Sequence, residues 1–141
     1  MDIVGIQNAV YTTLQTGMAG VVNEFYAQHP DSISNTPAMV MGQPKLSVTL
    51  GQRQDTDCLM PLRFYVGRVA DNARAAIIVN NLVNAFIVAM NPIASYTNLW
   101  RVITRIDIDT DRYYEVARTQ YHAIDVVLHM ELIETGNWTS T

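Results

Sequence analysis

The chain has 141 residues, of which 49% are hydrophobic and 16% are charged, and its formal net charge is −4. The length predicts a single domain whose core needs no metal or disulfide, and a charge content below the typical value of roughly 25% predicts that some apolar surface is buried against a partner. The acidic balance argues against a protein that grips nucleic acid by its phosphates, and a single cysteine, Cys58, excludes an internal disulfide.

We expect neither a signal peptide nor a membrane-spanning segment. The residues Met1–Gly5 carry no positive charge, whereas a signal peptide begins with a positively charged region. The longest apolar run, 73–90, contains Arg74 and three asparagines and is followed by Pro92. We therefore interpret it as a buried helix and expect no contact with a membrane.

A helix is predicted at the N-terminus, over about residues 2–15. Apolar residues recur there at helical spacing: Ile3, Ile6, Val10 and Leu14. Similar spacing resumes after Gly20, so the sequence leaves open whether the helix continues to residue 26. Turn-forming residues then predict a loop over 29–37.

Two strand regions are predicted next, over about 38–50 and 58–68. Alternation of apolar and polar residues is typical of strands, and Gly42-Gln43-Pro44 splits the first region in two. Since Pro61 lacks a backbone donor, we expect the second strand to lie at a sheet edge near that residue. The connection 51–57 is polar and contains the charged residues Arg53, Asp55 and Asp57.

A long central helix is predicted over 71–90, with Asp71 as its N-cap and Pro92 just beyond its end. Its apolar residues are not confined to one stripe, unlike those of a surface helix. We expect the sheet to cover one side, and either the N-terminal helix or a neighbouring subunit to cover the other.

A β-hairpin is predicted over 99–133. In both arms the even-numbered positions are mostly apolar and the odd-numbered positions carry the charge, so each arm has one core face and one polar face. The polar face carries Arg101, Arg105, Asp107, Asp109, Asp125, His129 and Glu131. The expected register places Arg105 opposite Asp125 and Arg101 opposite His129. Two roles remain open for this face: register and solubility, or a ring of charges at a subunit interface or lumen.

The connection between the two arms, 110–119, is predicted to be a polar loop. Its charged residues Asp111, Arg112 and Arg118, together with Arg53, Asp55 and Asp57, are candidates for contacts with a partner. The alternative is that both loops are simply solvated. The tail 135–141 is expected to be mobile.

No catalytic, metal or cofactor site is predicted, and we do not expect an enzyme. The string Asp107-Ile108-Asp109-Thr110-Asp111 is similar to the start of a calcium loop, but the required Gly and Glu are replaced by Arg112 and Arg118. The histidines His122 and His129 fall on opposite faces of the predicted arm, which argues against zinc. Cys58 is expected to be a small buried hydrophobic residue.

Together these elements predict the fold class α/β (α+β) and a single domain, 1–141. A mostly antiparallel sheet packs against the N-terminal helix and the long central helix, and a C-terminal β-hairpin closes the sheet.

This order of elements resembles that of the tail-terminator, or tail-completion, proteins of long-tailed bacteriophages. The resemblance spans roughly residues 2–134 and is carried by 37–41, 62–66, the helix 73–90 and the strand 121–128. It implies a structural protein of the virion neck, assembled in the host cytoplasm as a hexameric ring. The ring would cap the tail tube, stop its polymerisation and dock on the head connector, and DNA would pass through its lumen without specific binding. The resemblance supplies no active-site residues and no cofactor.

Two other classes of function are compatible with the sequence. One is a different ring component of the phage neck, such as a head-completion or connector protein. The other is a small α/β ligand-binding domain. The mass of the protein in solution separates the ring formers from a ligand-binding monomer.

Overall fold

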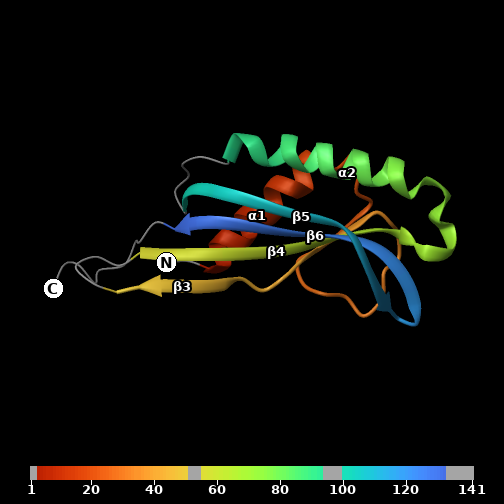
Figure 1. Ribbon diagram of the computed structural model, residues 1–141, viewed down its shortest axis with the longest axis horizontal. Coiled ribbons are helices and arrows are strands. Elements are labelled where there is room, and N and C mark those ends of the chain that lie inside the picture. The colour runs from red at the N-terminus through yellow and green to blue at the C-terminus, as the bar shows by residue number, and fades with distance from the viewer. Residues whose placement is uncertain (1–2, 51–54, 94–99, 133–141) are drawn as a thin grey trace.

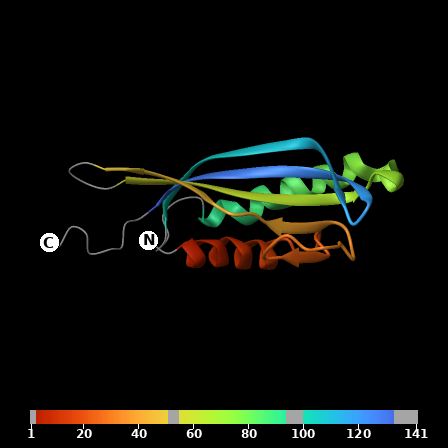
Figure 2. The ribbon, with the colours of Figure 1, turned by 90° about the horizontal axis from the view of Figure 1, so that it is seen from below.

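The computed structural model describes residues 3–50, 55–93 and 100–132. It confirms the predicted fold class, because one mostly antiparallel sheet carries two helices on one of its faces (Figures 1 and 2). Neither described helix is long and apolar enough to cross a membrane. The elements in chain order are α1 (Ile3–Gly17), β1 (Glu24–Tyr26), β2 (Ala38–Met41), β3 (Lys45–Thr49), β4 (Asp55–Arg68), α2 (Ala75–Met90), β5 (Trp100–Val116) and β6 (Thr119–Leu132), with short 3₁₀ segments on either side of α2, Val69–Arg74 and Asn91–Ile93.

The sheet is built around two long central strands, β4 and β6. The strand order is β1-β2-β4-β6-β5, and β3 pairs with β4 on the same side as β2. Residues 55–59 of β4 therefore pair with β3, and residues 62–65 pair with β2. All pairs are antiparallel except β1 with β2, which is parallel.

The main core lies between the sheet and the two helices. Successive side chains of a strand point to opposite faces, so alternate residues of β4 and β6 meet the helices. Phe64 of β4 and Phe86 of α2 pack edge to face, with ring centroids 5.7 Å apart. The buried residues of this core include Ile6, Val10 and Leu14 from α1, Leu82, Phe86 and Met90 from α2, Met60, Leu62, Phe64 and Val66 from β4, and Ile124, Val126, Leu128 and Met130 from β6.

A smaller core lies on the opposite sheet face, which we call the open face. It occupies the end near the β5–β6 turn, where Tyr65 and Tyr121 pack edge to face at 5.6 Å. Tyr26 and Ile33, which precede β2, pack against this cluster. The predicted loop over 29–37 thus becomes a cover for one end of the open face.

The N-terminal helix ends at Gly17 and so corresponds to the shorter of the two predicted forms. After α1 the chain makes a turn in which the amide of Val22 donates to the carbonyl of Met18, 2.9 Å away. Residues 24–26 then form β1, which pairs with β2, so the extension of the helix to residue 26 is wrong. The apolar spacing there has another cause, because Val22 and Phe25 pack on the core as part of a turn and a strand. The predicted start at Asp2 lies outside the described residues.

The second predicted strand begins earlier and lies elsewhere in the sheet than expected. β4 begins at Asp55 because β3 folds back on it, so part of the predicted connection 51–57 is strand. The edge position predicted from Pro61 is wrong, since β4 has neighbours on both sides. Pro61 falls between the ladders with β2 and β3, where its carbonyl accepts from the amide of Gly42 at 2.9 Å. A missing donor is tolerated at this gap between two ladders.

The central helix begins at Ala75 rather than at residue 71. Asp71 has non-helical backbone angles inside the preceding 3₁₀ segment, and its carboxylate accepts from Arg68 Nε at 2.8 Å. The predicted N-cap role of Asp71 is therefore wrong. Arg74 occupies the N-cap position and makes no side-chain capping bond.

The hairpin is tighter than expected and has a different register. Ala117 and Arg118, with φ of 50° and 66°, form a two-residue turn, so most of the predicted loop 110–119 is strand. Arg105 lies opposite His129 rather than Asp125. Arg101 is not opposite His129 either, because the register shifts between residues 100 and 102 and again between 103 and 105. Such bulges insert an extra residue, which also explains why Ile103 is buried in the core although its number is odd. The predicted mobile tail, 135–141, lies outside the described residues.

The contact between α1 and α2 generates a matched pair of substitutions. A Cβ added at Gly17 would lie 2.7 Å from the Cβ of Ala89, whereas one added at Gly20 would meet nothing within 4 Å. We expect Gly17→Ala to lower the free energy of unfolding by about 1–3 kcal/mol through overpacking, and Gly20→Ala to change it by less than about 0.5 kcal/mol. Urea denaturation followed by circular dichroism measures both, and equal stability of the two variants would contradict this packing.

Candidate functional site

The open face gathers most of the polar side chains that the sequence singled out. Alternate residues of β4, β5 and β6 point to this face, away from the helices. At its centre Arg63 of β4 lies directly opposite Asp125 of β6 in the ladder. The site therefore depends on the register of the two central strands.

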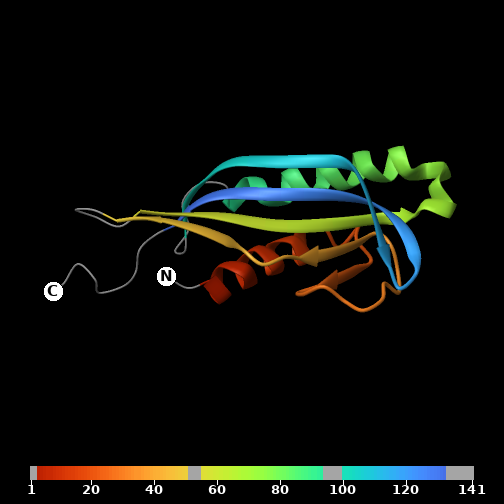
Figure 3. The same cartoon turned by 60° about the horizontal axis from the view of Figure 1, so that its bottom comes forward.

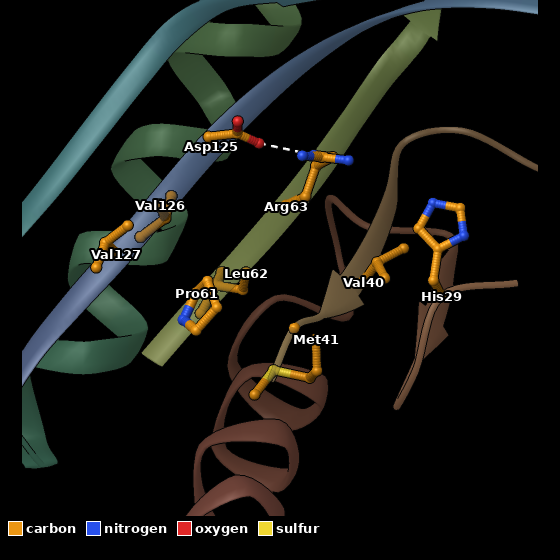
Figure 4. A pocket seen from close by; sticks show the side chains of 10 residues that line it. His29, Val40, Met41, Pro61, Leu62, Arg63, Asp125, Val126 and Val127 are labelled. Atoms are coloured by element: carbon orange, nitrogen blue, oxygen red, sulfur yellow. Dashed lines mark hydrogen bonds and ion pairs between the residues drawn. The ribbon is translucent and has the colours of Figure 1, made fainter. Parts of the chain in front are cut away.

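Arg63 and Asp125 form the best-defined ion pair of the face (Figure 4). Arg63 Nε donates to Asp125 Oδ1 at 2.7 Å, and the two side chains are only 30% and 27% exposed. The guanidinium also lies over the ring of Tyr114, with 3.5 Å between its central carbon and the ring centroid. Partial burial makes this pair more selective for geometry than a solvated surface pair.

Tyrosine hydroxyls extend this ion pair on both sides. Tyr114 donates its hydroxyl to Asp125 Oδ2. Arg63 Nη1 donates to the hydroxyl of Tyr65 at 3.3 Å, and His29 Nε2 lies 3.1 Å from the same oxygen. Burial and the bond to Asp125 raise the pKa of Tyr114, so its hydroxyl remains a donor at neutral pH.

A pocket of about 310 Å³ lies beside this network (Figure 4). Arg63 and Asp125 stand at one side of it, and the remaining lining is mainly apolar. The volume falls at the lower end of the range for small-molecule sites. The other lining residues are His29, Val40, Met41, Gly42, Pro61, Leu62, Val126 and Val127.

A second polar group lies on β5 and β6, farther from the β5–β6 turn than the central ion pair. His129 Nε2 is 2.7 Å from Asp107 Oδ2, and Arg105 Nε is 3.2 Å from Asp107 Oδ1. The hydrogen bond from His129 and the charge of Arg105 lower the pKa of the Asp107 carboxyl. Arg105 and Asp107 are more than half exposed, so this group is a solvated network rather than a buried one.

The register also brings two carboxylates together. Asp109 lies opposite Asp125 in the ladder, and like charges in this position are destabilising. Each carboxylate has its own arginine as a counter-charge. Arg112 Nε donates to Asp109 Oδ2 at 2.7 Å, while Arg63 holds Asp125. The amide of Asp111 donates to Asp109 Oδ1 at 3.0 Å and helps to shape the bulge there.

The remaining predicted residues are distributed along the strands. Asp57 is exposed on β4 opposite Glu131 of β6, and Arg118 occupies the exposed β5–β6 turn. Asp55 pairs through its backbone with Thr49. Arg53, and the side chains of Asp55 and Arg101, lie outside the described part of the chain. The structure thus brings Arg105, Asp107 and His129 together, whereas Asp57 and Arg118 lie apart, on β4 and in the β5–β6 turn.

The helix layer carries a different kind of surface. Ile77, Ile87 and Val88 of α2 are 62%, 49% and 72% exposed. Asn80, Asn81 and Asn84 are exposed between them. We call this surface the α2 stripe; it contains no charged residue. The N-terminal helix α1 contacts α2 but does not cover the stripe. Of the two covers predicted for α2, the N-terminal helix and a neighbouring subunit, the first therefore leaves the stripe exposed and available to a partner.

The structure defines the surroundings of the calcium-like string and of the cysteine. Among the described residues, no group of three or more His, Cys, Asp or Glu is placed to hold a metal ion. Two carboxylates of the calcium-like string are instead paired, Asp107 with His129 and Arg105, and Asp109 with Arg112. Cys58 is buried on the helix side of β4, where burial raises the pKa of its thiol to about 11. A thiol in this state is a poor nucleophile.

Sequence reasoning missed four members of the central network: Arg63, Tyr114, Tyr65 and His29. A usable signal was present, because Arg63 lies between Leu62 and Phe64, and Asp125 lies between Ile124 and Val126. Such charges are rarely buried unless they are paired. The pairing itself could not be assigned without the β4–β6 register, and Tyr114 was placed in a predicted loop.

Comparison with known proteins adds no assignment to this site. No protein-family model matches the chain, and no curated protein sequence matches it.

The two neighbouring aspartates provide a stability test of the central network. Asp125→Asn keeps the side-chain shape but removes the charge that Arg63 and Tyr114 both bind, so we expect a loss of about 1–3 kcal/mol. Asp109→Asn makes the same change at a more exposed carboxylate, 46% exposed, and we expect a loss below about 0.5 kcal/mol. Urea denaturation measures both; a larger loss for Asp109→Asn would overturn the assignment of the central pair.

The polar group on β5 and β6 predicts a pH dependence centred on Asp107. Since its pKa is lowered in the folded state, its contribution to stability is present above the unfolded-state pKa and is lost as the pH falls through the folded-state value. We expect His129→Ala to return the pKa of Asp107 toward its ordinary value of 3.8. A carboxyl NMR titration measures this change. His122→Ala is the control, because His122 Nε2 contacts the carbonyl of Thr110 instead; an equal shift in both variants would contradict the proposed cause.

Proposed function

We propose that the protein is a structural component of a bacteriophage neck, a tail terminator that forms a ring on the end of the tail tube. In this role the ring stops tube polymerisation, joins the tail to the head connector and lets DNA pass through its lumen. The proposal rests on the family resemblance of the sequence and is supported by the surfaces of the fold.

The observation that carries the proposal is the pairing of arginines on the open face. Arg63, Arg105 and Arg112 of this face each contact a carboxylate within 3.2 Å. Proteins hold DNA chiefly by neutralising phosphates with free cations. A surface of paired charges in an acidic protein is suited to a channel wall along which DNA slides without being retained.

The two layers of the molecule also suit assembly into a ring. The α2 stripe is uncharged and partly apolar, whereas the open face carries charges of both signs on the opposite side of the sheet. Copies that join through their edges can turn one of these surfaces to the lumen and the other outward, and head-to-tail contacts generate a ring when the rotation closes. Charges of both signs at such an edge set the register of the contact rather than its strength.

Another ring component of the neck, a head-completion or connector protein, is the nearest alternative. The physical argument for it is the same, and only the partner differs. Loss of a terminator leaves tails of uncontrolled length or unattached tails, whereas loss of a head-completion protein leaves heads that leak DNA. Electron microscopy of a phage lacking the protein therefore separates the two.

A small ligand-binding domain is favoured by one observation, the pocket beside Arg63 and Asp125. Its apolar lining with a charged pair at one side is typical of small-molecule sites. A protein that remains monomeric at all concentrations and is stabilised against heat by a metabolite would support this function and overturn the ring.

The terminator role is tested by mixing the purified protein with a polymerising tail tube protein. We expect rings by electron microscopy, shorter tubes as the ratio of this protein to tube protein rises, and the protein located at one tube end. Unchanged tube length with no end-bound density would overturn the proposal. Because Arg63, Arg105 and Arg112 of the open face are paired, we also expect no retention of DNA in a mobility-shift assay at physiological salt.

The variant Arg105→Glu separates assembly from folding. Glu at this position faces Asp107 across a short distance and reverses one charge of the open face, so we expect assembly measured by sedimentation velocity to fall. The melting temperature is expected to change little, because exposed ion pairs contribute at most about 1 kcal/mol. Arg68→Glu, which reverses an exposed arginine paired with Asp71 at the end of β4, is the control. Normal assembly of Arg105→Glu would exclude a role of this charge in the contact between subunits.

A further inference from the structure

The half of the sheet that lies away from the β5–β6 turn has two free edges. There the strands lie side by side in the order β3, β4, β6, β5 (Figure 1). Among the described strands, β3 pairs only with β4 and β5 pairs only with β6. A free edge presents unpaired backbone donors and acceptors, and these are a template for strand addition.

The two edges have compatible directions. Each neighbouring pair in β3-β4-β6-β5 is antiparallel, so β3 and β5 run in opposite directions. When two copies stand side by side in the same orientation, β3 of one is therefore antiparallel to β5 of the next. The sheet can continue from copy to copy without a change of pairing type.

The two edges also have regular segments of equal length. β3, Lys45–Thr49, pairs with β4 without a bulge and follows Pro44, which cannot donate to a ladder. On β5 the regular segment is 105–109, because register shifts occur just before Arg105 and just after Asp109. The second bulge precedes a bend that turns β5 away from the line of the sheet (Figure 3).

The side chains of these segments are complementary on both faces. In the register that overlaps all five residues of each, Leu46 and Val48 of β3 meet Ile108 and Ile106 of β5. All four point to the helix side, since Leu46 and Val48 lie opposite Cys58 and Thr56, while Ile106 and Ile108 pack against the core. On the other face the same register sets Lys45 opposite Asp109, an attractive cross-strand pair.

We propose that strand β3 of one copy adds to residues 105–109 of strand β5 of the next copy, with Lys45 opposite Asp109 and Leu46 opposite Ile108. This inference rests on the proposed ring and names its subunit interface. It accounts for a strand whose five residues are all exposed, with Leu46 and Val48 36% and 44% exposed in the single chain.

The chemistry of the edges favours this head-to-tail contact over a two-fold one. An antiparallel pairing of 105–109 with itself would place Asp107 against Asp107 of the second copy, and opposed like charges are destabilising. A pairing of β3 with itself would leave the β5 edge free and Lys45 without an acidic partner across the strands. The test includes this second arrangement as an outcome.

Disulfide cross-linking between two variants tests the register. In the proposed pairing Ser47 lies opposite Asp107, within reach of a disulfide, and these substitutions leave Lys45 and Asp109 unchanged. A mass-tagged Ser47→Cys protein is mixed with an untagged Asp107→Cys protein and oxidised. We expect a mixed dimer at roughly tenfold the yield obtained with Glu115→Cys, a matched exposed acidic residue of β5 beyond the bulge. The buried Cys58, with its raised pKa, stays outside the exchange.

The outcomes separate this interface from the proposed function. A yield of mixed dimer no higher than with Glu115→Cys would overturn the interface, and so would predominant Ser47–Ser47 dimers of the tagged protein, which indicate the two-fold arrangement. If sedimentation velocity of the unmodified chain still shows rings, the ring remains and its copies meet elsewhere. If the unmodified chain is monomeric throughout and stays so with tube protein, the proposed function falls as well.

The proposed Lys45–Asp109 pair provides a second test, which needs no cross-link. We expect Lys45→Glu, which opposes Asp109 with a like charge, to shift the sedimentation profile toward monomer, and Lys45→Arg to retain assembly. Circular dichroism checks that both variants are folded; Lys45 is exposed, so neither change is expected to disturb the core. Equal assembly of the two variants would overturn the Lys45–Asp109 contact.

Discussion

The antiparallel ladder between β4 and β6 is the constraint on which the rest of the structure depends. It runs from Asp57 opposite Glu131 to Arg68 opposite Tyr121, and it decides which side chains meet the helices. A shift of one residue would move the core residues of either strand to the open face and bury Arg63 under α1 and α2. The main core and the central ion pair are therefore two consequences of one register.

The charges of the open face follow from the same ladder. A half-buried arginine needs a partner, and the register supplies Asp125 to Arg63. It also places Asp109 beside Asp125, and this repulsion is relieved because the bulge after Asp109 brings Arg112 back to it. The bulge thus has an electrostatic as well as a geometric effect. The result is a surface on which Arg63, Arg105 and Arg112 are each paired with a carboxylate.

Local patterns were sufficient to predict the fold class, both helices and the long strands, because their hydrophobic periods are strong. They failed where tertiary pairing overrides local propensity. β1 and the start of β4 form strands only because β2 and β3 lie beside them. The turn at Ala117–Arg118 has no glycine, although positive φ favours it, so a ten-residue loop was predicted there. The candidate site was predicted in part: Arg105, Asp107 and His129 meet, whereas Arg63 and Tyr114 required a register that bulges had displaced.

The two free edges of the sheet are protected to different degrees, and this difference bears on assembly. β5 is long but interrupted by bulges and rich in charge, two features that discourage non-specific pairing of edge strands. β3 has one charged residue, Lys45, and alternating apolar residues, with no bulge against β4. A strand of this kind invites aggregation unless it has a specific acceptor. In the proposed interface, the regular segment 105–109 is that acceptor, because its bulges and acidic residues favour one register over others. The bulges that protect β5 and the exposed residues of β3 would then serve the same contact, with β5 selecting the register in which β3 adds.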